Sequence, residues 1–151
     1  MDNSHDISVL NTLIATTLDS MKGYRESAED SENSTHAQFF REMAEERSQV
    51  ASDLQQQVRS LGGDPEMDSS TAGAAHRGWV DLKAAITGHD EQAVVNEVER
   101  GEDYIKGKFE AAMKDDELSA AARGAIETAF GSIRKGHDRA SQMKHAMADV
   151  D

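Results

Sequence analysis

The feature that most constrains this chain is a helical repeat of apolar residues that recurs along it. In VVNEVERGEDYIKGKFEAAM, residues 94–113, apolar side chains fall three, four or seven positions apart, so they share one face of a helix. The alternation expected of a half-buried strand does not compete with this pattern. The sequence therefore predicts an all-α fold in which long helices each bury one face.

Caps and breaks divide the 151 residues into five helical segments of a single domain, 1–151. Thr35, Asp90 and Ser119 have the side chains of helix caps, and the Gly62-Gly63 pair ends a helix. The predicted helices cover about residues 6–29, 35–61, 73–87, 90–114 and 119–147.

The connection between the second and fourth long stretches sets the predicted topology. The first two helices are joined by a short loop, as are the last two, which favours antiparallel pairs. Residues 62–89 combine about 26 Å of extended chain with about 22 Å of helix, enough to run the length of a bundle. Helices 35–61 and 90–114 would then run parallel. We therefore predict a ferritin-like four-helix bundle with a long crossover that carries a short fifth helix.

The composition of the chain indicates which classes of partner and which cellular compartment to expect. The chain has 29 acidic against 16 basic residues, a formal net charge of -13, which argues against a nucleic-acid partner. It contains no cysteine, so it has no disulfide and no thiolate metal ligand. The start lacks the pattern of a signal peptide, and no apolar run approaches the ~20 residues of a membrane span. We expect a cytoplasmic protein without a membrane partner, and a homo-oligomer formed through helix faces stays open.

Several polar side chains are predicted to point into the bundle at mid-height. Arg47 and Glu102 each lie ~12 residues from the start of their helices, about 18 Å down, and His137 lies about 15 Å from the end of its helix. Glu46 lies at the edge of the face that contains Arg47. Because single buried charges are costly, these residues must satisfy one another or bind something.

Five short motifs span most of the chain. They are LDSMKGY (18–24), AEERSQVASDLQ (44–55), LGGDP (61–65), HRGW (76–79) and ERGED (99–103), and the specific part is HRGW and ERGED after LGG. With these motifs the chain resembles a bacterial family of small four-helix-bundle proteins in the ferritin-like superfamily, catalogued mostly as a domain of unknown function. The resemblance implies a stress-associated bacterial protein with no established reaction.

The resemblance also supplies a metal hypothesis. The wider superfamily binds two metal ions through a Glu from each of two helices and a Glu-x-x-His from each of the others. The match here is partial, because Gln49 follows Glu46 where a His would stand, and Arg134 precedes His137 where a Glu would stand. Glu102 takes the single-Glu position of its helix.

The first helix and Arg47 weaken this hypothesis. That helix offers only Asp19, which is predicted to face away from the core, or Glu29, which lies near one end. At ~6 Å and an effective dielectric constant of ~20, an inward Arg47 would oppose a divalent ion by roughly 5 kcal/mol. What remains is a degenerate mono- or di-metal site for iron or zinc, with the ligands Glu46, Glu102 and His137 and with Asp19 or Glu29 as a further candidate.

The competing interpretation makes the same residues a structural network. Arg47 and Glu102 would form a buried ion pair with His137 beside it, and such a pair can fix helix register without adding stability. Trp79 would cover the end of the core, and the hydroxyl of Tyr24 would reach the polar layer or solvent. The residues favour a structural or interaction role over catalysis, and the metal-binding alternative stays open.

Overall fold

The computed structural model describes residues 3–68 and 74–150, with side chains described for 3–68 and 78–145. The start predicted for the third helix, residue 73, and the side chains of His76 and Arg77 lie outside this part. The described residues contain no strand, and the predicted all-α class is confirmed. The helices are α1 (Ser4–Asp30), α2 (Ser34–Ser60), α3 (Ala74–Thr87), α4 (Glu91–Met113) and α5 (Ala120–Val150).

Short polar side chains cap the starts of α2, α4 and α5. Asp90 and Ser119 cap α4 and α5, since each accepts a hydrogen bond from the backbone N–H three residues on, at 3.0 and 3.1 Å. The cap of α2 is Asn33 rather than the predicted Thr35, because Asn33 Oδ1 accepts the corresponding backbone bond at 3.0 Å. After α2, Gly62 adopts a φ of 85°, where a side chain would be strained.

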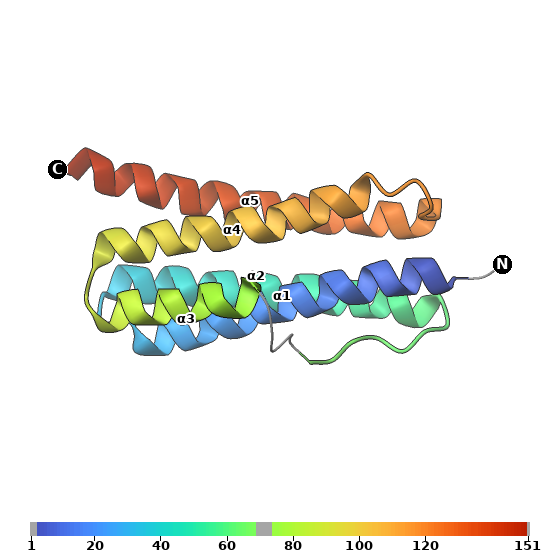
Figure 1. The fold of residues 1–151 in the computed structure, drawn as a ribbon, viewed down its shortest axis with the longest axis horizontal. Coiled ribbons are helices and arrows are strands. Elements are labelled where there is room, and N and C mark those ends of the chain that lie inside the picture. Colours follow the sequence, from blue (N-terminus) through green and yellow to red (C-terminus); the bar gives the residue numbers. More distant parts are fainter. Residues whose placement is uncertain (1–2, 69–73, 151) are drawn as a thin grey trace.

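The helices lie along one common axis and run up or down it (Figure 1). α1 leads away from the N-terminal end and α2 returns towards it. The chain then passes back through α3, after which α4 runs in the direction of α2 and α5 in the direction of α1. α1 packs mainly on α2 and α4 on α5, whereas α3 lies over α1 and α4. Within the described residues α2 and α4 have no close backbone contact, so they lie diagonally across the bundle.

The apolar core has two parts along the bundle. One part includes Leu18 of α1 and Ile105 of α4, and the other includes Met43 of α2 and Val98 of α4. On every long helix a gap separates the two parts, and the gaps fall at the same level. The residues in these gaps that face inward are Ser20, Arg47, Glu102 and Gly136, all of them buried.

The crossover helix α3 docks through Trp79. The Trp79 ring meets Tyr24 edge-on, with 5.0 Å between ring centroids and 76° between planes. Its other neighbour is Gly23 of α1, where even a methyl group would overlap the indole ring. A glycine at this position therefore lets the crossover lie close to α1. Among the described residues, no helix has both the length and the apolar composition needed to cross a membrane.

This contact predicts a specific effect of Gly23→Ala. The added methyl group must push Trp79 away, and overpacking of this kind costs roughly 1–3 kcal/mol in the free energy of unfolding. Trp79 is the single tryptophan of the chain, so its fluorescence emission should move to longer wavelength as the ring becomes more exposed.

The matched control is Gly107→Ala on α4, where a Cβ would meet nothing within 4 Å. This variant should keep the wild-type emission and lose no stability, because alanine favours a helix. If Gly23→Ala behaves like its control, α3 does not pack on α1 as described.

Candidate functional site

A charged pair lies at the centre of the bundle. Arg47 of α2 and Glu102 of α4 each have only 1% of the side chain exposed. Arg47 Nη1 donates to Glu102 Oε2 at 2.9 Å, and Nη2 donates to Oε1 at 2.6 Å. Two parallel hydrogen bonds between planar groups form the strongest arrangement available to such a pair. The pair therefore links the two helices that lie diagonally opposite.

Two side chains of α1 complete the polar layer. The Tyr24 hydroxyl donates to Glu102 Oε2 at 2.6 Å, and Arg47 Nη1 also donates to Ser20 Oγ at 2.9 Å. Both residues of α1 are buried. The Glu102 carboxylate thus accepts three hydrogen bonds, which compensates its removal from water.

α5 contributes space to this layer. A Cβ at Gly136 would overlap Arg47 Nη2 and would lie 3.2 Å from Glu102 Oε1. At Gly124 and Gly131, on the same helix, a Cβ would meet nothing within 4 Å. Of these three glycines of α5, only Gly136, at the level of the charged pair, has no room for a side chain.

Burial and charge set the protonation states in this layer. Burial lowers the pKa of Arg47, but the neighbouring Glu102 carboxylate outweighs burial and raises it. The pKa of Tyr24 lies well above its usual range, first because burial disfavours the phenolate and then because Glu102 is negative. Arg47 therefore stays charged, and Tyr24 stays a hydrogen-bond donor near neutral pH.

The predicted metal ligands do not come together. Glu102 is engaged by Arg47 and Tyr24, whereas Glu46 Oε1 accepts from Arg139 at 3.2 Å. His137 Nε2 lies 2.6 Å from an oxygen of Asp103, and its side chain is 20% exposed.

His137 thus lies outside the Arg47–Glu102 network, in contrast to the sequence prediction. Helix phase placed His137 inward by counting from Ile133. The buried line of α5 instead runs through Ile133, Gly136 and Ala140, which leaves His137 at its edge. A glycine has no hydropathy to mark it as inward, so this signal was missed. Ser20 was missed because a lone serine on a helix is usually solvent-facing.

The other residues considered for a metal site differ in whether their side chains are buried or exposed. Asp19, which was predicted to face away from the core, is only 6% exposed and lines a pocket together with Gly78 and Trp79 of α3. The reason is α3, which covers this side of α1, whereas helix phase considered only the four long helices. Glu29 is exposed near the end of α1, and Gln49 and Arg134 are also exposed.

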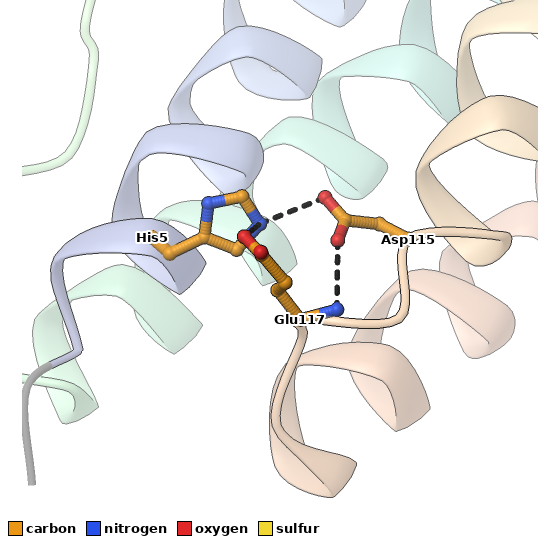
Figure 2. A group of neighbouring side chains, drawn as sticks. All are labelled: His5, Asp115 and Glu117. Atoms are coloured by element: carbon orange, nitrogen blue, oxygen red, sulfur yellow. Dashed lines mark hydrogen bonds and ion pairs between the residues drawn. The ribbon is translucent and has the colours of Figure 1, made fainter.

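A second group of titratable residues lies where α1 begins (Figure 2). His5 Nε2 lies 2.8 Å from Asp115 Oδ2 and 3.9 Å from Glu117 Oε2. In the described part of the chain, this is the one group of three His, Asp or Glu residues whose ligand atoms lie within 4.8 Å of one another. Nearby, Asp6 accepts a hydrogen bond from the Ser119 N–H at 3.0 Å. Together these contacts fasten α1 to the turn between α4 and α5.

The charges of this second group shift two pKa values in opposite directions. The hydrogen bond to Asp115 raises the pKa of His5, and the charges of Glu117 and Asp6 act in the same direction. The pKa of Asp115 is lowered, first by the backbone N–H of Glu117 and then by His5.

Residues 5–115 match a protein family described as Domain of unknown function (DUF2383). The chain belongs to this family. The part that matches the DUF2383 family includes Ser20, Tyr24, Arg47 and Glu102, and it ends in the turn before α5, so it leaves out Gly136. None of the curated proteins matches the chain.

The charged pair predicts non-additive losses of stability. Glu102→Ala should lower the free energy of unfolding by roughly 3–5 kcal/mol, because Arg47 is left as a buried charge without a partner. Adding Arg47→Leu should recover part of this loss, since the double variant removes both charges. A double-mutant cycle measured by denaturant unfolding gives the coupling.

His137→Ala is the control for this cycle, because His137 lies outside the network. Its small effect should add to that of Glu102→Ala. Additive effects of Glu102→Ala and Arg47→Leu would show that the two charges do not act as a pair.

The His5 contact predicts a pH-dependent contribution to stability. A raised folded pKa means that the His5 contribution is complete below its ordinary value of 6.5 and is lost as pH rises through the folded pKa. A lowered folded pKa means that the Asp115 contribution is present above 3.8 and is lost as pH falls.

The difference in Tm between the wild type and His5→Gln should therefore be larger at about pH 5.5 than at about pH 9. His145→Gln, at an exposed position of α5, should show no such change and serves as the control. An equal Tm difference at both pH values would argue against the ion pair.

Proposed function

We propose that this chain is a small, stress-associated bacterial protein with a structural or interaction role, built as a ferritin-like bundle in which a charged pair replaces a di-metal centre. One observation carries the proposal. Glu102, at the single-Glu position of its helix, has both carboxylate oxygens bonded to the Arg47 guanidinium, at 2.9 and 2.6 Å. The residue best placed to bind a metal ion is thus already neutralised by a cation.

The other residues also fail to fit a di-metal centre. A divalent ion at the pair would lie closer to Arg47 than the ~6 Å at which repulsion is already roughly 5 kcal/mol. Glu46 and His137 are engaged by Arg139 and Asp103. The donors of this layer therefore suit an ion pair better than iron or zinc.

The surface narrows the kind of partner that an interaction role would need. Among the described residues, the large apolar side chains that are exposed are those of Met67 and Val80. The net charge is -13. A protein partner would therefore recognise the bundle mainly through charge, and a basic surface is the natural complement.

A metal-binding role is the second candidate, and the group in Figure 2 favours it. His5 supplies a ring nitrogen, and Asp115 and Glu117 supply carboxylate oxygens, a donor set that suits zinc or another transition metal. This site would lie at the end of the bundle rather than at its centre.

Metal chemistry at the bundle centre tests the first of these proposals. We expect protein purified without an affinity tag to oxidise iron(II) no faster than buffer does. A chelator should leave its unfolding transition unchanged, because the charged pair needs no ion.

Iron(II) oxidation well above the buffer rate, lost in Glu102→Ala, would overturn the proposal. A metal-binding role of the His5 group would be supported by a different result. Added zinc would raise the Tm of the wild type and of Glu102→Gln, but not that of Glu117→Gln.

A further inference from the structure

A pocket of about 120 Å³ lies between α1, α3 and α4, next to the charged layer. Its lining is mostly apolar and includes the rings of Trp79 and Tyr104 and the side chain of Ile105. An apolar cavity of about 150 Å³ accommodates benzene. The volume therefore suits a compact molecule of about the size of one aromatic ring.

Three of the sequence motifs meet at this pocket. LDSMKGY supplies Asp19 and Ser20, HRGW supplies Trp79, and ERGED supplies Arg100 and Gly101. Of these pocket residues, only Ser20 also belongs to the charged layer, through its hydrogen bond to Arg47. The other four residues line the same pocket, so residues of all three motifs share one location.

The walls are held by contacts that do not depend on a ligand. Trp79 is placed by its close approach to Gly23 and by the Tyr24 ring. Glu97 and Arg100 form an ion pair in the pocket wall at 3.3 Å. The pocket is thus largely formed in advance, as small-molecule sites usually are.

Ser20 gives the pocket a polar contact point. Its hydroxyl accepts a hydrogen bond from Arg47 Nη1, so its own proton is free to be donated. Among the described residues, no hydrogen bond donated by this hydroxyl is found. Because Ser20 is buried and lines the pocket, a ligand could supply an acceptor for its proton.

We propose that the pocket binds a small uncharged molecule, of about the size of an aromatic ring, that places an acceptor atom on the Ser20 hydroxyl. The aromatic walls hold its apolar body. The acceptor fixes its orientation, next to the residue that supports Arg47. This activity lies beyond the structural or interaction role proposed above.

Phenol is a suitable probe, and benzene is the matched compound without an oxygen. Trp79 gives the single indole N–H signal in a ¹H–¹⁵N spectrum, because the chain has one tryptophan. We expect phenol to shift this signal saturably. Its affinity should exceed that of benzene about fivefold, the ratio that corresponds to one hydrogen bond of ~1 kcal/mol.

Two glycines of α4 provide the decisive pair of variants. Gly101 lines the pocket, and a Cβ there would meet nothing within 4 Å, so Gly101→Leu should fill the pocket without a backbone clash. Gly107 has equally free space but lies outside the pocket, so Gly107→Leu is the control. Phenol binding should be lost in Gly101→Leu and kept in Gly107→Leu, with thermal unfolding confirming that both are folded.

Ser20→Ala tests the polar contact point. Its affinity for phenol should fall to that for benzene. The proposal is overturned if phenol does not shift the wild-type Trp79 signal, or if Gly101→Leu binds phenol as well as the control does. Equal binding of phenol and benzene by the wild type would overturn the role of Ser20.

Discussion

The Arg47–Glu102 pair is the interaction on which the rest of the structure depends. It crosses the diagonal between α2 and α4, receives hydrogen-bonding partners from α1, and requires a glycine on α5. Taking two charges out of water costs about as much as their attraction returns, so the pair is weak evidence for stability. Its stronger effect is on register. A slip of one residue on α2 or α4 turns Arg47 or Glu102 by about 100° and leaves a buried charge unpaired.

In the function proposed above, the same pair takes the place of a metal centre. In a di-metal bundle, carboxylates from several helices meet and the ions neutralise them. Here the guanidinium of Arg47 neutralises Glu102, and Tyr24 provides a further donor to the carboxylate. The cation is therefore covalently part of the fold. It needs no supply of metal, and it is present at any pH at which Arg47 stays charged.

The sequence predicted this layer in part. Helix phase and depth brought out Arg47 and Glu102, because a charge on an apolar face is a visible exception. They did not exclude His137, since a residue at the edge of a buried line differs from an inward one by only tens of degrees. The burial of Asp19 was not predicted, for another reason. Its burial depends on α3, a tertiary contact that periodicity within α1 cannot report.

Tyr24 joins the charged layer to the crossover helix. Its hydroxyl bonds to Glu102, and its ring supports Trp79, which in turn lies against Gly23. Because the pKa of Tyr24 is raised, the stability that this link adds is complete below the ordinary value of 10.0 and is lost only as pH rises beyond it. Any shift of Trp79 must therefore disturb the ring whose hydroxyl holds Glu102. The docking of α3 and the integrity of the central pair are thus one physical unit, and the pocket that they enclose has walls on both.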